Sequence, residues 1–298
     1  MTDLREQIEA VIRATIFHST AYSWYGRRSP RLSPRIRRAL TPLTQRNYLV
    51  FQLQSQLYRD FYCQGMASPA REQGGGLAAA GTTHFVQALS DANCGEGYWD
   101  DGWSVSALDR DFVVARNGRL ELQAGFEQCR VAGEGDLQLG TRVYLRYPKE
   151  FRSFSPGFYM ASSNRPPIDD TPGSIVRVYW NIAAEGAVRF LCSATSLLNG
   201  AGLAFRLKVV NDPTLYTRCD AAVLYFHRDD YPLVARLLPE LYAGAATNLK
   251  QGTPAFTKCL WGASAWRRTR ARVPALGFTA AGSWQRAFSV RTTTGRRP

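Results

Sequence analysis

The feature that most constrains the fold is a strand–helix–strand pattern in the second half of the chain. Residues 174–182 (SIVRVYWNI) and 203–210 (LAFRLKVV) alternate as strands do. Between them, residues 186–198 place four apolar side chains on one face of a helix, namely Ala187, Leu191, Ala194 and Leu198. A helix of about thirteen residues between two strands is typical of a crossover connection. A third apolar segment, 219–227, follows, so we expect at least three neighbouring strands.

The rest of the chain reads as shorter elements around this unit. Helical spacing predicts further helices over 3–17, 44–62, 84–93 and 233–249. Alternation and turn signals predict strands over 111–115, 119–123, 141–147 and 157–161, and loops over 26–42 and 162–174. We therefore predict an α+β fold, with a helical N-terminal portion followed by a mixed or antiparallel sheet with flanking helices. The expected domains are a helical portion with a Pro/Arg-rich loop (1–80), an α+β domain (81–260) and a basic, irregular tail (261–298).

The net charge of +13 first suggests nucleic acid, but its distribution argues against that partner. Residues 241–298 hold ten basic residues and no acidic one, so most of the excess belongs to the tail. No apolar run is long enough to span a membrane, and the first residues do not resemble a secretion signal. We expect a cytoplasmic protein that binds neither nucleic acid nor membrane.

Cysteine and histidine usage argues against a metal or a disulfide scaffold. The six cysteines are scattered without a CxxC pair, and the three histidines form no HExxH motif. We expect free thiols in a reducing compartment, no metal ion and no cofactor.

Polar side chains recur on one face of the three predicted strands. Because strand side chains alternate, each group shares one side: Arg177, Tyr179 and Asn181; Arg206 and Lys208; Arg218 and Asp220. On a single strand this pattern indicates a solvated face. Because the pattern repeats over three segments, an anion pocket is about as good an interpretation as three solvated faces, since guanidinium groups suit phosphate geometry.

Lys208 adds a chemical possibility to that pocket. A lysine among arginines is expected to have a lowered pKa, because its charged form is repelled. A neutral lysine can act as a base, so arginine-bound phosphate beside Lys208 suits β-elimination.

Several motifs, in order, carry a resemblance to a known family. They are ANCGEGYWDDGW (92–103), SPGFYMA (155–161), RVYWN (177–181), LNGAGLAFRLKV (198–209), YTRCDAAVLY (216–225) and TPAFTK (253–258). Over roughly residues 45–260 the chain resembles the HopA-type effector family. That family includes bacterial type III effectors and the lyase components of actinobacterial class V lanthipeptide and thioamide-peptide biosynthesis.

The resemblance implies a phosphothreonine-lyase-like fold and a phosphoserine/phosphothreonine lyase without metal. A separate kinase similar to aminoglycoside phosphotransferases would phosphorylate a precursor peptide, and this chain would eliminate the phosphate to give dehydroalanine or dehydrobutyrine. The resemblance makes Lys208 the candidate base and Arg177, Arg206 and Arg218 the candidate phosphate ligands. The expected substrate-binding residues are Tyr179, Asn181 and Asp220. His84 is the candidate acid, although both His84 and His227 also read as ordinary surface or packing residues.

The chain departs from the family after TPAFTK. Family members continue with a segment like GLGLAEDPG, whereas this chain reads WGASAWRRTRARVP (261–274). GC-rich codons for this stretch give the family segment in another frame, so we expect residues from about 261 to be out of frame and removable. Two alternatives to the lyase stay open: a non-catalytic partner of the precursor peptide or kinase, and a type III effector acting on a host protein.

Overall fold

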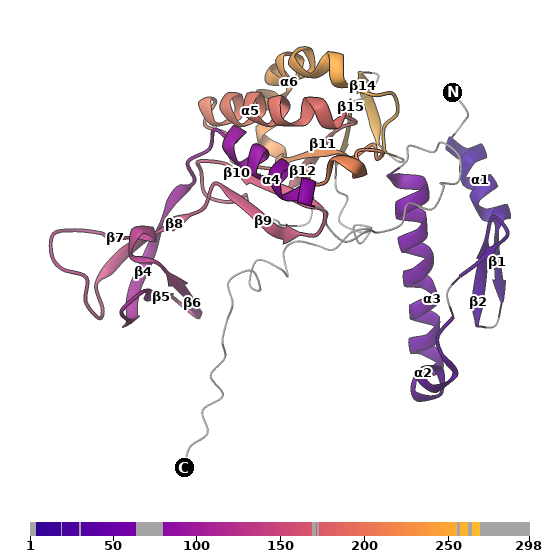
Figure 1. Ribbon diagram of the computed structural model, residues 1–298, viewed down its shortest axis with the longest axis horizontal. Coiled ribbons are helices and arrows are strands. Elements are labelled where there is room, and N and C mark those ends of the chain that lie inside the picture. Colours follow the sequence, from indigo (N-terminus) through magenta and orange to yellow (C-terminus); the bar gives the residue numbers. More distant parts are fainter. Residues whose placement is uncertain are drawn as a thin grey trace.

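The computed structural model describes residues 4–18, 20–29, 31–63, 80–168, 171, 173–254, 257–261 and 264–268. Figure 1 shows a central sheet with its helices, a second sheet at one end and an N-terminal unit at the other. The fold is α+β, as predicted, and every strand pairing in the described ranges is antiparallel.

The N-terminal unit combines a small sheet with three helices. Its elements are α1 (Leu4–Ala14), β1 (Thr15–His18), β2 (Ala21–Trp24), β3 (Arg27–Arg28), α2 (Pro34–Ala39) and α3 (Pro42–Leu57). Ser33 caps α2 and Thr41 caps α3, each followed directly by a proline, the residue favoured at a first helical position. A π-helical turn, η1 (Tyr58–Tyr62), continues α3 toward the central sheet.

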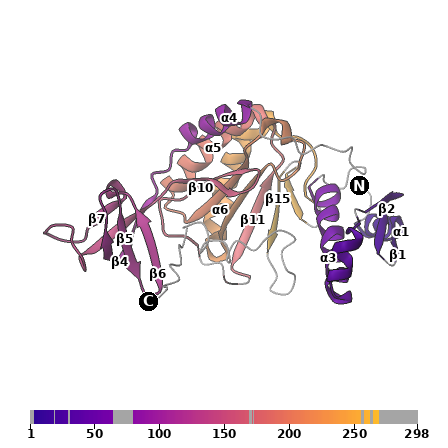
Figure 2. The same cartoon turned by 60° about the horizontal axis from the view of Figure 1, so that its bottom comes forward.

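The central sheet has seven strands in the order β14-β15-β11-β13-β12-β10-β9. Their bounds are β9 (Glu150–Ser155), β10 (Phe158–Ser162), β11 (Ile175–Trp180), β12 (Phe205–Val210), β13 (Ala222–His227), β14 (Lys258–Trp261) and β15 (Ser264–Arg268). Three helices cover one face of this sheet: α4 (Ala80–Ala92), α5 (Ala184–Gly200) and α6 (Tyr231–Ala245) (Figure 2). The main core lies between that face and the helices, and it includes the fully buried Trp180, Phe205 and Leu224.

The predicted crossover is present, with one strand inserted. β11 and β12 are both antiparallel to β13, which lies between them, so β11 and β12 run parallel and α5 connects them. The four apolar residues that predicted α5 are all buried beneath it, namely Ala187, Leu191, Ala194 and Leu198. The local sequence pattern therefore predicted the helical connection between β11 and β12. It did not predict that β13 pairs between these two strands, because that order depends on long-range contacts.

A separate five-stranded sheet lies between α4 and the central sheet in the sequence. Its order is β6-β5-β4-β8-β7, with bounds β4 (Tyr98–Leu108), β5 (Val113–Asn117), β6 (Leu120–Ala124), β7 (Cys129–Val131) and β8 (Arg142–Tyr147). It buries its own small core, built around Trp103, Val113 and Val143. Short 3-10 turns complete the described chain at 126–128, 213–215, 228–230 and 246–248.

Several sequence expectations differ from the structure. The helix expected over 3–17 ends at Ala14, because the β-branched and aromatic run Thr15–Phe17 continues as β1. The loop expected over 26–42 contains β3 and α2. Strands β4 and β9 were not predicted, since Gly102 and the polar Asp100 and Asp101 mask the alternation of β4.

The prediction of an irregular tail from residue 261 is wrong for the strand β15. Ser264–Arg268 pairs with the whole of Val176–Trp180 on β11, and β14 pairs with β15 in turn. These backbone hydrogen bonds occupy the outer edge of β11. The remaining tail residues, 269–298, lie outside the described residues.

Among the described residues, no helix combines the length and the hydropathy needed to cross a membrane.

Candidate functional site

Two rows of side chains cross the face of the central sheet that is opposite the helices. In one row, Arg177 on β11 is paired with Tyr225 on β13, and Tyr225 with Arg206 on β12. In the next row, Val223 lies between Tyr179 and Lys208 in the same way. The face-sharing predicted for Arg177, Tyr179, Arg206 and Lys208 is therefore correct.

Three cationic side chains converge on the ring of Tyr225. The Cζ atoms of Arg177 and Arg206 lie 5.4 Å and 5.9 Å from its centroid, and Nζ of Lys208 lies 5.5 Å from it. Such distances are in the range of cation–π attraction. Arg206 is buried, at 6% exposed, whereas Arg177 and Lys208 are half-buried and can reach a bound group.

Arg218 joins this group through a second aromatic ring. Its Cζ lies 4.8 Å from the centroid of Phe158 on β10, and Nζ of Lys208 lies 5.7 Å from the same centroid. Lys208 also donates a hydrogen bond of 3.1 Å to Oγ of Ser155 in β9. We call Arg177, Arg206, Lys208 and Arg218 the cation cluster.

Asp220 orients Arg218 from the loop that precedes β13. Nε and Nη2 of Arg218 donate to the two carboxylate oxygens of Asp220 at 2.5 Å and 2.9 Å, a bidentate geometry. Burial acts to lower the pKa of Arg218, but the Asp220 carboxylate outweighs it, so that pKa is raised. Asp220 is only 3% exposed, so it acts here as a positioning residue for Arg218.

The N-terminal unit closes one side of the site through η1. The hydroxyl of Tyr58 donates to Oδ2 of Asp220 at 3.1 Å, and Nη2 of Arg218 donates to Tyr58 at 3.2 Å and to Sγ of Cys63 at 3.3 Å. Burial, followed by the charge of Asp220, raises the pKa of the Cys63 thiol to about 12. Cys63 is therefore a protonated packing group at neutral pH rather than a thiolate nucleophile.

Tyr179 belongs to the same contact between the two units. It is 4% exposed, and its ring meets that of Tyr62 edge-on, with centroids 6.3 Å apart. Tyr62, Cys63, Tyr179 and Val223 form a small buried cluster of their own. The aromatic end of the 44–62 segment carried a visible signal of this contact, but sequence reasoning missed Tyr58, Tyr62, Tyr225 and Phe158 as site residues.

Two predicted site residues lie elsewhere. Asn181 donates to the carbonyl oxygens of Gln251 and Gly252 at 2.7 Å and 3.2 Å and so fixes the loop after α6. His84 is exposed on α4, in the helical layer on the opposite face of the sheet. The structure therefore does not bring His84 and Lys208 together, and the role of His84 as the acid stays a prediction.

The arrangement is suited to a multiply charged anion. Four cationic side chains and one carboxylate meet above two aromatic rings, and guanidinium groups bind phosphate oxygens in pairs. Among the described residues, no group of three or more His, Cys, Asp or Glu side chains could hold a metal ion.

Part of this chain is similar to a known sequence family. Residues 150–272 match the model of the HopA1 effector protein family. The matched segment contains β9 to β15 and the whole cation cluster, and it extends past residue 261, where we expected the family pattern to end.

Two solved structures are similar to the chain at low identity. One is the effector protein from Pseudomonas syringae pv. syringae strain 61, with 14% identity, a TM-score of 0.39, and coverage of 78% of this chain and 82% of that one. The other is the effector protein from Pseudomonas syringae pv. tomato strain DC3000, with 13% identity, a TM-score of 0.41, and coverage of 75% and 72%. No curated protein sequence matches the chain. By its sequence, the part of the chain that carries the central sheet and its cation cluster is similar to the HopA1 effector protein family.

Proposed function

We propose that this protein is a phosphoserine/phosphothreonine lyase that eliminates phosphate from a phosphorylated precursor peptide. The observation that carries the proposal is the convergence of Arg177, Arg206, Lys208 and Arg218 around Tyr225 and Phe158. A phosphate monoester brings the charge that such a group of cations favours. The similarity of residues 150–272 to the HopA1 effector protein family supports the same assignment, because the resemblance to the HopA-type family implies a lyase.

The proposed reaction balances without an external reactant. The side-chain amine of Lys208 takes the Cα proton of the phosphorylated residue, the electron pair forms the Cα=Cβ double bond, and the Cβ–O bond breaks. Phosphate leaves with that bonding pair while Arg177, Arg206 and Arg218 stabilise its charge. The proton then passes from Lys208 to phosphate, which restores the lysine and yields dehydroalanine or dehydrobutyrine.

Asp220 and the residues of η1 would act indirectly. By binding Nε and Nη2 of Arg218, Asp220 fixes the direction in which the third guanidinium nitrogen, Nη1, points. Tyr58 and Cys63 complete the contacts of that guanidinium, so the N-terminal unit would help to shape the site.

The partners follow from this chemistry. A separate kinase, proposed as similar to aminoglycoside phosphotransferases, supplies the phosphorylated peptide in the cytoplasm. The second candidate is an effector that performs the same elimination on a host protein, and the name of the matching family favours it. A neighbouring gene for such a kinase, beside a short Ser/Thr/Cys-rich precursor gene, would favour the biosynthetic role over the effector role.

The mass of the product tests the proposal. The purified protein is incubated with a peptide carrying phosphoserine or phosphothreonine, and the product is weighed by mass spectrometry. A lyase gives a product that lacks one water relative to the unphosphorylated peptide, a phosphatase gives the unphosphorylated peptide, and a binding protein leaves the phosphopeptide intact. Only the first result supports the proposal.

Variants of Lys208 then test its role as the base. Lys208→Ala and Lys208→Arg should both leave phosphopeptide unconverted, because arginine keeps the positive charge but does not give up its proton. Unchanged thermal unfolding of both variants serves as the folding control. Dehydration at the wild-type rate in Lys208→Arg would remove Lys208 as the base.

A further inference from the structure

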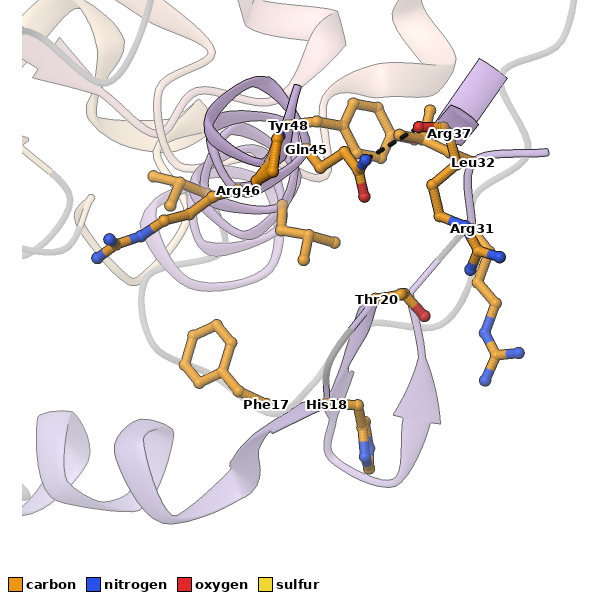
Figure 3. Close-up of a pocket in the computed structure, with 12 residues that line it drawn as sticks. Phe17, His18, Thr20, Arg31, Leu32, Arg37, Gln45, Arg46 and Tyr48 are labelled. Carbon is orange, nitrogen blue, oxygen red and sulfur yellow. Dashed lines mark hydrogen bonds between the residues drawn. The ribbon is translucent and has the colours of Figure 1, made fainter. Parts of the chain in front are cut away.

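The N-terminal unit contains a cleft that the proposed chemistry does not use. It has a volume of about 570 Å³ and lies between the β1–β2 hairpin and the helices α2 and α3 (Figure 3). This volume falls within the usual range of ligand pockets. Its wall includes Phe17, Leu32 and Leu49 as well as three arginines, namely Arg31, Arg37 and Arg46.

The shape of the cleft is fixed by hydrogen bonds. Nε2 of Gln45 on α3 donates to the carbonyl oxygens of Arg37 and Leu40 at 2.9 Å and 3.0 Å, which holds α2 against the start of α3. On the other side, Nε2 of His18 lies 2.9 Å from Oγ of Ser23 within the hairpin. Both walls are therefore anchored before anything binds.

Helix α3 lacks the burial that would normally support a helix of its length. Its sixteen residues include none that is buried, and Leu43, Val50 and Phe51 are between 44% and 66% exposed. A helix this long is marginal in water without packing of an apolar face. Pro42, Gln45, Arg46, Leu49 and Val50 line the cleft at the three- and four-residue spacing of one helical face. Additional packing on this face is therefore expected.

The charge around the cleft is of one sign. Between Glu9 and Asp60 the sequence holds nine arginines and neither Asp nor Glu. Within the part of the chain that the structure describes, the ion pairs include none from Arg31, Arg37 or Arg46. An occupant of this cleft therefore needs negative charge as well as apolar side chains.

We infer that the cleft is a docking site for an acidic, amphipathic segment of a polypeptide partner. Apolar side chains would enter between Phe17, Leu32 and Leu49, while carboxylates would meet the arginine rim. Nucleic acid would satisfy the arginines but not the apolar wall, and a membrane surface is flat where this site is concave. The inference goes beyond the proposed lyase, because binding here requires no chemistry on phosphate.

Fluorescence anisotropy with labelled synthetic peptides tests this docking site. The probe is a short peptide in which Glu and Leu alternate in an amphipathic pattern. One comparison peptide replaces Glu by Lys, and another replaces Leu by Ser. We expect saturable binding of the Glu/Leu peptide alone, and equal binding of the Glu/Leu and Glu/Ser peptides would overturn the amphipathic requirement.

Charge reversal locates the binding. Arg31→Glu with Arg46→Glu should weaken binding of the Glu/Leu peptide by at least about tenfold, because two attractive charges become repulsive. The matched control reverses Arg110 and Arg119, which are exposed in the β4–β5 and β5–β6 connections of the five-stranded sheet and change the net charge equally. Equal effects of both pairs, or no effect of either, would refute the site.

Three further readouts cover other occupants. A labelled single-stranded oligonucleotide or vesicles of phosphatidylserine could bind more tightly than the Glu/Leu peptide. If that binding is lost in the Arg31/Arg46 variant, the result would contradict a peptide ligand. A dimer in sedimentation that the same variant dissociates would assign the cleft to a second copy of the chain. Elimination from a short phosphopeptide without acidic residues should be unchanged in this variant, so failure of the docking site and failure of the lyase are separable.

Discussion

Removing one partner of the pair Arg218–Asp220 should lower stability far more than removing one partner of a surface pair with hydrogen bonds of the same length. Asp220 is 3% exposed and accepts two hydrogen bonds from Arg218, whose side chain is 22% exposed. Removing one partner of a buried pair typically costs 3–5 kcal/mol, since the other charge is left uncompensated. Because Arg218 keeps some solvent contact and Asn can still accept one bond, we expect Asp220→Asn to lower the free energy of unfolding by about 3 kcal/mol.

The surface pair Arg116–Glu121 provides the matched control. Its two hydrogen bonds, both to Oε1 of Glu121, are 2.5 Å and 2.9 Å long, the same lengths as in the buried pair, but its side chains are 58% and 48% exposed. Glu121→Gln should therefore cost less than about 1 kcal/mol.

Urea unfolding followed by circular dichroism measures both variants, and a shifted midpoint at constant slope reports stability. The double variant Arg218→Gln/Asp220→Asn should be more stable than Asp220→Asn alone, because it carries no buried uncompensated charge. Equal small losses for Asp220→Asn and Glu121→Gln would refute the argument from burial.

Three further predictions follow from other parts of the fold. Glu150 accepts hydrogen bonds from Ser90, Arg152 and Tyr159, and although burial raises its pKa these contacts outweigh it and lower the pKa below the usual 4.5. The stability that Glu150 contributes should therefore be complete at neutral pH and be lost as the pH falls below about 4.5. The difference in urea midpoint between wild type and Glu150→Gln should shrink in acid. A difference in midpoint that is constant with pH would contradict this prediction. Maleimide at neutral pH should label the exposed Cys94 in the native protein and should not label the buried Cys63 or Cys219, because burial raises the pKa values of these two thiols to about 12 and about 11. Peptide mapping identifies the labelled cysteine, and rapid labelling of Cys63 would contradict its buried position. Truncation after residue 257 should lower the thermal midpoint and the soluble yield, because it removes the strand that pairs with β11, and an unchanged midpoint would show that β15 adds nothing to the sheet.

The local sequence pattern predicted the elements around the cation cluster well. Period-two alternation placed Arg177, Arg206 and Lys208 on one face, and the register confirms that they share it. The resemblance to the HopA-type family likewise holds for the segment that contains these residues.

The remaining site residues depend on contacts far apart in the sequence. Tyr58 meets Asp220 across 162 positions, and no local period encodes that distance. Tyr225 lies between Arg177 and Arg206 only because β13 inserts between β11 and β12. For His84, helical spacing predicted the helix, but the side of the sheet on which that helix packs depends on contacts that local spacing does not contain.

The tail shows how composition can mislead. A stretch with many arginines and no acids predicted an irregular segment, yet Ser264–Arg268 pairs along β11. Backbone hydrogen bonds to an open sheet edge do not require a particular side-chain composition, so composition alone underestimated this strand. The expectation that the reading frame changes near residue 261 stays a prediction that the gene sequence decides.

The central claim is that the cation cluster binds the phosphate group itself, and calorimetric titration tests it most directly. In a Lys208→Ala background, which prevents turnover, the same peptide is titrated with and without its phosphate, in proteins with and without Arg177→Gln. Loss of a charge-assisted hydrogen bond worth about 2 kcal/mol should weaken phosphopeptide binding by about 30-fold and leave the unphosphorylated peptide unaffected. Arg119→Gln, in the β5–β6 turn, should change neither. If Arg177→Gln weakens both peptides by the same factor, the arginine contacts the peptide rather than its phosphate, and the central claim fails.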